Sequence, residues 1–166
     1  MIREAYEKDI DEIVELLRQV NQVHADGRPD LFKAGGVKYT KENLIDMMEM
    51  WHFEPAGRVL EHGVVRIYVY VKDKHVRGYI FCRYTFTEEF QNLKASREVY
   101  IEDLCVDEAM RGQGIGRELF EYACEMARVN ACERMPLRVW ECNPTAKAFY
   151  ESMGMSPLYT GMEYKI

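Results

Sequence analysis

A glycine-rich run between two apolar segments is the part of the sequence with the clearest chemistry. It reads DEAMRGQGIGR over 107–117, after a predicted strand and at the start of a predicted helix. Glycine allows positive φ and close approach of the backbone to a ligand. The first N–H groups of a helix are unpaired and lie at the positive end of the helix dipole, so they bind anions. With Arg111 beside them, Gly112, Gly114 and Gly116 predict a site for an anion such as a pyrophosphate.

The spacing excludes two common phosphate loops. A Walker loop has a Lys-Ser/Thr pair after its glycines, and none follows here. The dinucleotide fingerprint fits at Gly112 and Gly114, but its third glycine would fall at Arg117. The alternative is a glycine-rich connection without a ligand. The strand–loop–helix context favours the anion site.

Two neighbouring carboxylates, Glu102 and Asp103, interrupt the otherwise apolar strand predicted over Val99–Val106. A buried charge is costly without a partner, so these acids need a structural or chemical reason. Because neighbouring residues of a strand face opposite sides, we expect only one of them to face a given site. Glu102 would share its face with Leu104 and Val106.

A short helix near the end of the chain has clear boundary signals. Asn143 is a good N-cap, Pro144 suits the first helical position, and Gly154 fits just past the last one. One face of this helix carries Ala146, Phe149, Tyr150 and Met153. Tyr150 is then either a packing ring whose hydroxyl bonds the backbone or a polar group of a site.

Hydrophobic periodicity predicts the elements that position these residues. After a short piece around Ile2, the pattern predicts one helix capped by Asp9 and extending to Val20, and another capped by Thr40. The segment Asn21–Lys38 reads as a loop. The later predicted elements are strands Val64–Val71, Val76–Phe86 and Val99–Val106, a helix after the glycines, a strand Leu137–Trp140, a helix Pro144–Met153 and an extended tail Leu158–Ile166. This order predicts an α/β fold: a mixed, mostly antiparallel central sheet with a β-α-β unit and helices on both faces.

Length and composition predict one globular domain over residues 1–166. Hydrophobic residues make up 48% and charged residues 30%, which is typical of globular proteins and excludes dominant disorder. No stretch approaches the roughly 20 apolar residues of a membrane-spanning helix. The first residues contain no apolar signal region, so we expect a cytoplasmic protein without a membrane partner.

The charge balance limits the classes of binding partner, and the cysteine spacing bears on metal binding. There are 22 basic and 28 acidic residues, a net charge of −6, which argues against a nucleic-acid partner and is compatible with a cationic substrate. No C-x-x-C pair and no Cys/His cluster has metal-binding spacing, so we expect no metal site. We expect buried, reduced thiols at Cys82, Cys105, Cys124, Cys132 and Cys142.

The run Arg111-x-x-Gly114-x-Gly116 after an apolar strand resembles the acetyl-CoA pyrophosphate loop of the GNAT superfamily of N-acetyltransferases. The element order is similar along essentially the whole chain, and the segment from Asn143 to Gly154 is similar to a second motif of that superfamily. The strand Tyr100–Leu104 with the glycine loop looks most like the polyamine and diamine acetyltransferase branch. The resemblance implies a GNAT-like fold and an acyltransferase that moves an acetyl group from acetyl-CoA, its cosubstrate, directly onto a primary amine.

The resemblance also implies roles for individual residues. Tyr150 would protonate the departing thiolate as general acid, and Glu102 would act as base; a structural salt bridge or amine binding by Glu102 remains an open alternative. The residues implied in acetyl-CoA binding are Leu104, Cys105, Val106, Arg111, Gly112, Gln113, Gly114, Ile115, Gly116, Asn143 and Tyr150. An acetyl-cysteine at Cys105 is a further alternative, but nothing in the sequence marks this thiol as activated.

The acceptor is expected to be a small cationic amine. The alternatives are a protein N-terminus or lysine, and a module that binds acetyl-CoA without catalysis. Specificity is expected in Asn21–Lys38, Tyr39–Phe53 and Thr87–Glu98, with His24, Asp26, Arg28, Asp30 and Trp51 as candidate residues. The resemblance implies a homodimer, to which the last strand would supply an edge.

Overall fold

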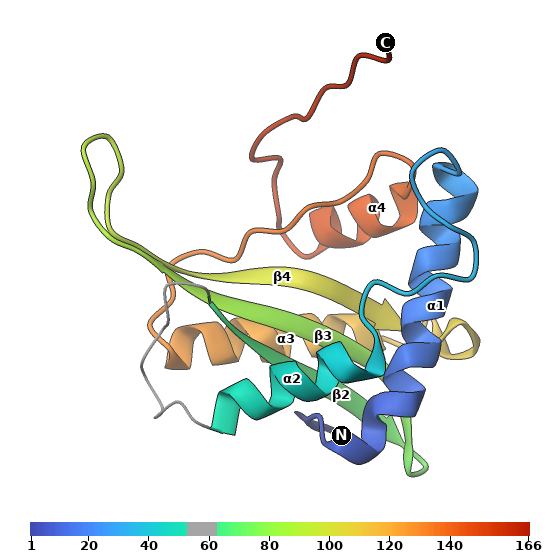
Figure 1. The fold of residues 1–166 in the computed structure, drawn as a ribbon. Coiled ribbons are helices and arrows are strands. Elements are labelled where there is room, and N and C mark those ends of the chain that lie inside the picture. The colour runs from blue at the N-terminus through green and yellow to red at the C-terminus, as the bar shows by residue number, and fades with distance from the viewer. Residues whose placement is uncertain (53–62) are drawn as a thin grey trace.

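The computed structural model describes residues 1–52 and 63–166 of the chain. Its centre is an antiparallel sheet with the strand order β1 (Ile2–Glu4), β2 (Val64–Lys72), β3 (His75–Thr87) and β4 (Ser96–Val106). Helices α1 (Ile10–Gly27) and α2 (Lys41–His52) cover one face, and α3 (Ile115–Val129) covers the other (Figure 1). Helix α4 (Pro144–Ser152) lies beyond β4. The predicted α/β class, with helices on both faces of an antiparallel sheet, is confirmed.

The strands bury residues on both faces because alternate side chains point to opposite sides. Under α1 and α2, the core contains Ile13, Leu17, Leu44, Ile67, Val69, Tyr79 and Phe81. Under α3, it contains Tyr68, Ile80, Cys82, Val99, Ile101, Leu119 and Ala123. Strand β3 is therefore buried on both faces and is the rigid centre of the sheet.

Helix α1 is longer than the sequence predicted. The expected loop starts at Asn21, but the helix continues to Gly27. Ala25 is buried and extends the apolar stripe of the helix from Leu17, with no glycine or proline before Gly27. The extra turns bring His24 to the ends of β4 and α4, which matters for the site below.

The predictions of two further strands toward the C-terminus were wrong. In Leu137–Trp140, only Leu137 forms a bridge, parallel to Ile101, and Arg134 forms another with Glu98. The β-α-β crossover from β4 through α3 therefore exists, but it ends in isolated bridges rather than a strand. The tail Leu158–Ile166 has no strand either; it extends past α4 (Figure 1), and its Glu163 and Lys165 pair with Arg28 and Asp30 after α1. Strand pairing depends on a partner edge, which residue pattern alone does not supply.

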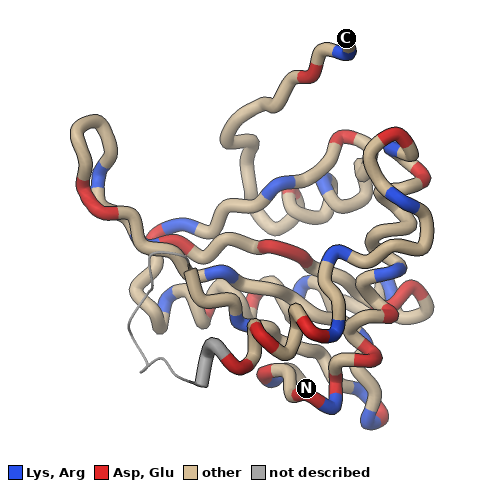
Figure 2. The backbone as a smooth tube through the Cα atoms, in the orientation of Figure 1, with Lys and Arg blue, Asp and Glu red and all other residues tan. Residues whose placement is uncertain are grey.

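Charges are interspersed over the backbone, with an acidic stretch in the middle of β4 (Figure 2). That stretch contains Glu102 and Asp103. Within residues 1–52 and 63–166, no helix is long and apolar enough to span a membrane.

Candidate active site

One cavity of about 1220 Å³ connects the C-terminal half of α1, strand β4, the glycine loop and α4. It brings together nearly all of the predicted site residues: Glu102, Leu104, Cys105, Val106, Arg111, Gly112, Gly114, Ile115, Gly116, Asn143 and Tyr150. Gln113 does not line it. Its side chain instead lies 3.4 Å from Lys72 Nζ and 3.8 Å from Met110 Sδ.

The cavity opens where β4 separates from the segment beside it. Val99 and Ile101 donate N–H groups to the carbonyls of Arg134 and Pro136, both at 3.0 Å. Beyond these bonds, the cavity is lined on one side by Glu102–Val106 and on the other by Arg138–Trp140. The C-terminal half of β4 therefore has an open edge that faces a ligand-sized space.

A bulge in β4 decides which side chains face this space. Phe81 pairs with Asp103 and Cys82 with Ile101, so no residue of β3 lies opposite Glu102 in the strand register. An extra residue interrupts the alternation of side chains. Glu102 and Asp103 consequently both line the cavity, and the expectation that they face opposite sides was wrong because alternation holds only in a regular strand.

The bulge also redirects the backbone. Asp107 donates its N–H to Arg77 of β3 at 2.9 Å. Because N–H direction alternates along a strand, Leu104 and Val106 direct their N–H groups away from β3, toward the open edge. The N–H of Leu104 approaches the Asp103 carboxylate and helps to stabilise its charge. The N–H of Val106 is then the backbone donor available to a ligand.

Glu102 is held by three side chains. Its carboxylate accepts hydrogen bonds from Arg83 Nε at 2.5 Å, Tyr39 Oη at 3.1 Å and Lys38 Nζ at 3.2 Å. Burial disfavours its charge, but the bond from Arg83 and the positive charge of Lys38 outweigh burial and lower its pKa below the usual range. A carboxylate stabilised in this way is a weak proton acceptor.

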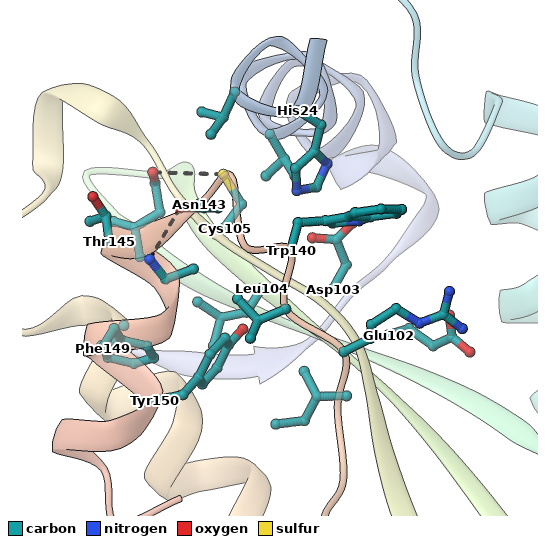
Figure 3. A pocket seen from close by; sticks show the side chains of 18 of the residues that line it. His24, Glu102, Asp103, Leu104, Cys105, Trp140, Asn143, Thr145, Phe149 and Tyr150 are labelled. Atoms are coloured by element: carbon teal, nitrogen blue, oxygen red, sulfur yellow. Dashed lines mark hydrogen bonds between the residues drawn. The ribbon is translucent and has the colours of Figure 1, made fainter. Parts of the chain in front are cut away.

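Asp103 has the opposite electrostatics. Burial raises its pKa to about 6, against partial compensation by Lys38, the Leu104 N–H and Tyr79. Its side chain lines the same cavity as His24, Trp140 and Tyr150 (Figure 3). A pKa near neutrality is what a general base needs. Sequence reasoning set Asp103 aside because it assumed a regular strand.

Tyr150 enters the cavity from α4, which begins as predicted with Asn143 accepting the Ala146 N–H at 3.1 Å. Its ring packs 5.2 Å from Phe149 and 6.4 Å from Phe120. Burial, and then the nearby Asp103 and Cys105, raise its pKa above the usual value, so the phenol stays protonated. Among the described residues its hydroxyl has no hydrogen-bond partner, and it is thus available as a donor.

The environment of Cys105 disfavours the thiolate form of its side chain. The thiol is buried, donates to the Leu16 carbonyl at 3.5 Å, and has its pKa raised to about 12 by burial. A thiol in this environment is not a nucleophile, so the acetyl-cysteine alternative has no support. Of the other cysteines only Cys82 is buried; Cys124, Cys132 and Cys142 are partly exposed, contrary to expectation, and all five are free thiols.

The glycine loop has the conformation that the sequence predicted. Gly112 and Gly114 have φ of 75° and 85°, which favours glycine. Gly114 is the N-cap of α3, no side chain caps the helix, and the Gly114 carbonyl accepts the Glu118 N–H at 3.0 Å. The N–H groups of Ile115, Gly116 and Arg117 therefore remain for an anion. Arg111 is anchored above Val106, whose carbonyl accepts its Nε at 3.2 Å.

The other end of the cavity has an aromatic wall that the sequence did not reveal. Phe32 lies 5.1 Å from His24 and 5.3 Å from Trp140. Burial, with the charge of Lys38, lowers the pKa of His24, which keeps this ring neutral at pH 7. Phe32, which follows the end of α1, meets Trp140, a residue more than 100 positions away, only through the tertiary fold.

The remaining specificity candidates lie elsewhere. Arg28 pairs with Asp30 at 2.9 Å and with Glu163 at 2.9 Å, outside the cavity lining. Asp26 accepts a hydrogen bond from Gln22, and no residue of 87–98 lines the cavity. The side chain of Trp51, and Phe53 at the end of the predicted segment, lie outside the described residues.

Comparisons with known proteins agree with this geometry. Residues 28–155 match the acetyltransferase (GNAT) family. Thialysine N-epsilon-acetyltransferase of Bos taurus is 34% identical over 62 residues, which are 37% of this chain and 36% of that protein. Mycothiol acetyltransferase of Beutenbergia cavernae is 35% identical over 72 residues, 43% of this chain and 24% of that protein. The matches thus span only about a third or less of these curated relatives.

Solved structures extend the likeness over the whole chain. A mutant of the BH1408 protein from Bacillus halodurans has a TM-score of 0.87 at 29% identity, covering 100% of this chain and 99% of its own. An aminoglycoside antibiotic 6'-N-acetyltransferase from Acinetobacter haemolyticus shares the fold, with a TM-score of 0.66 at 16% identity over 100% and 97% of the two chains. With the glycine loop, the open edge of β4 and the family match over most of its length, the chain belongs to the GNAT acetyltransferase family.

Proposed function

We propose that this protein transfers an acetyl group from acetyl-CoA directly onto a primary amine. The main observation that supports this proposal is that a single cavity holds an uncapped helix N-terminus, an open strand edge, a protonated tyrosine and a carboxylate with a raised pKa. These are the groups that acyl transfer to an amine requires. A module that only binds acetyl-CoA would need neither Tyr150 nor Asp103.

The residues present fit acetyl-CoA. The N–H groups of 115–117 and Arg111 suit its pyrophosphate. The open edge at Leu104–Val106 suits the amide groups of its pantetheine arm, and Asn143 lines the same cavity. Bound there, acetyl-CoA would supply an activated acyl group. Gln113 is left out of this set because its side chain points to Lys72 and Met110.

The chain's own residues then meet the chemical demands of the transfer. An alkyl ammonium with a pKa near 10.4 must lose a proton before it attacks, and Asp103 is the acceptor we propose. The C–N bond forms first and gives a tetrahedral oxyanion, which the Val106 N–H stabilises; the C–S bond then breaks and the CoA thiolate departs. Tyr150 donates its proton to the departing thiolate. Glu102, the base expected from the family resemblance, instead positions Lys38, Tyr39 and Arg83 around the acceptor.

A small amine is the acceptor class we propose. Trp140 and Asp103 line the same cavity, and together they suit an ammonium group through a cation–π contact and an ion pair. The relatives named for thialysine and aminoglycoside acetylation act on amines, which supports the same class here. A protein N-terminus or lysine is the competing acceptor.

The test is release of CoA from acetyl-CoA by the purified protein at about pH 8, where more of the amine is deprotonated. We expect release with one class among polyamines, lysine analogues, aminoglycosides, amino acids and short peptides. Release with peptides alone would favour the macromolecular acceptor. Acetyl-CoA binding by calorimetry without release for any amine would contradict the proposed catalysis.

We also propose a homodimer formed through the tail. Met162, Tyr164 and Ile166 are exposed by 95%, 90% and 119%, and they alternate with Glu163 and Lys165 as in a strand with one apolar face. Such a segment is stabilised by pairing with the sheet of a second copy. Tyr159, on the same tail, lines the cavity, so the pairing would affect the site.

Light scattering tests this proposal. We expect a mass of two chains for the wild type and of one chain for the double variant Met162→Lys and Tyr164→Lys. Val129→Lys is the matched control, because Val129 is 68% exposed at the C-terminal end of α3, and this variant should remain dimeric. A monomeric wild type, or a dimeric tail variant, would contradict the proposal.

A further inference from the structure

Tyr79 is a buried polar residue that the proposed chemistry does not yet use. It lies in β3, its side chain is 0% exposed, and its hydroxyl is the one buried side-chain oxygen or nitrogen in the described residues that has no hydrogen-bond partner. Native proteins pair nearly all such groups, because an unpaired buried hydroxyl destabilises the fold. The Tyr79 hydroxyl is therefore expected to find a hydrogen-bond partner through a small movement of a neighbouring group or through water.

The geometry places that partner on β4. Tyr79 pairs with Cys105, and Asp103 lies two residues away on β4, on the same face of the sheet, as a diagonal neighbour. The ring is fixed by Phe81 at 4.9 Å, which in turn stacks on Tyr39 at 5.5 Å. After burial, the charge of Asp103 is the largest influence that raises the pKa of Tyr79, since it is close enough to disfavour a phenolate.

The other groups around Asp103 have bonds elsewhere. Lys38 Nζ donates to the carbonyl and carboxylate of Glu102, at 2.8 Å and 3.2 Å. Tyr39 also donates to Glu102, and the Cys105 thiol donates to Leu16. On α1, His24 is neutral, so it brings no positive charge to the carboxylate, and its ring packs 5.1 Å from Phe32; on α4 the Tyr150 phenol is assigned to the thiolate. Besides the Leu104 N–H, Tyr79 is then the buried, unpaired donor on the adjacent strand β3 for the carboxylate.

We propose that Tyr79 is a positioning residue whose hydroxyl donates to the ionised Asp103 carboxylate, directly after a small rotation of that side chain or through one buried water. The bond would hold Asp103 in one orientation toward the acceptor amine. It would also keep the carboxylate ionised at neutral pH, because donation to the charged form lowers its pKa. This inference rests on the proposed role of Asp103 as proton acceptor.

The test compares Tyr79→Phe with Tyr68→Phe. Both changes remove a buried hydroxyl from the sheet, but Tyr68 lies on the opposite face and bonds Tyr84 at 3.2 Å. The first readout is the pKa of Asp103, from a titration of its ¹³C-labelled carboxyl carbon by NMR. The second is the pH at which kcat/KM bends on the acidic side.

We expect Asp103 to titrate near pH 6 in the wild type and about one unit higher in Tyr79→Phe, the size expected for loss of a hydrogen bond to a charged group. Below the bend, kcat/KM should then fall about tenfold, with an unchanged KM for acetyl-CoA. Tyr68→Phe should leave both readouts at the wild-type values. An unchanged Asp103 titration in Tyr79→Phe would overturn the inference.

The NMR titration needs no turnover, so it separates this inference from the proposed function. A shifted Asp103 pKa in Tyr79→Phe with no activity on any amine would support the contact and reject the catalysis. If Tyr79→Phe does not fold, Asp103→Asn provides the reverse measurement. It should move the ring carbon resonance next to the Tyr79 hydroxyl, whereas Asp107→Asn should not; an unmoved resonance in Asp103→Asn would reject the contact.

Discussion

Replacing Tyr150 with Phe should lower kcat by about 10²–10⁴-fold, the usual contribution of a positioned general acid. The raised pKa of Tyr150 keeps its proton in place at neutral pH, and its hydroxyl has no partner among the described residues. The aromatic packing against Phe149 and Phe120 is retained by Phe, so the change removes the donor without disturbing α4.

The measurement pairs turnover with acetyl-CoA binding. The dissociation constant for acetyl-CoA should change little, because the glycine loop and the β4 edge are untouched. Tyr159→Phe is a matched control, since Tyr159 lines the same cavity but is 65% exposed, and its kcat should stay near that of the wild type. Unchanged turnover in Tyr150→Phe would remove this residue from the mechanism.

Exchanging Asp103 for Asn should have a similarly large effect, about 10²–10⁴-fold on kcat/KM, because Asn retains the shape but cannot accept the proton. It should also abolish the bend in the pH profile near pH 6. Glu102→Gln should cost less activity and keep the bend, since its carboxylate serves Arg83, Tyr39 and Lys38. The reverse ranking, with the bend lost in Glu102→Gln, would return the role of base to Glu102.

Stability distinguishes the two carboxylates as well. The pKa of Asp103 is raised from 3.8 to about 6, so the folded state binds its proton more tightly than the unfolded state. The stabilisation of the fold by the protonated Asp103 carboxyl is fully present below pH 3.8 and is lost as pH rises through about 6. The ionised carboxylate therefore destabilises the fold at pH 7. Relative to the wild type, Asp103→Asn should therefore raise the melting temperature more at pH 7 than at pH 4.

Glu102 has a lowered pKa, so its contribution has the opposite sign: it is present at neutral pH and is lost in acid. Glu102→Gln should consequently lower the melting temperature at pH 7. For Asp103, by contrast, the substitution is expected to raise stability and to lower activity strongly. This combination is typical of functional sites, where activity is maintained at a cost in stability. Parallel melting curves of the two variants at pH 4 and pH 7 check the contrast.

Local features of the site were predictable from adjacent residues. The positive φ of Gly112 and Gly114, the Asn143 cap and the Tyr150 face of α4 all depend on side chains within a few positions of each other. Such signals concern one turn or one helix, and short-range sterics and hydrogen bonds determine them. The family follows from the same residues, because the anion loop and the second helix are its landmarks.

The tertiary structure decided what those residues face. The bulge at Glu102 depends on the register between β3 and β4, which no local pattern of β4 encodes, and it turned both carboxylates into the cavity. The pKa of Asp103 and the isolation of the Tyr79 hydroxyl result from burial among α1, β3 and α4. The sequence by itself therefore determined the fold class, the family and the conformation of the glycine loop, whereas long-range pairing and desolvation decided how the environments of the two carboxylates differ.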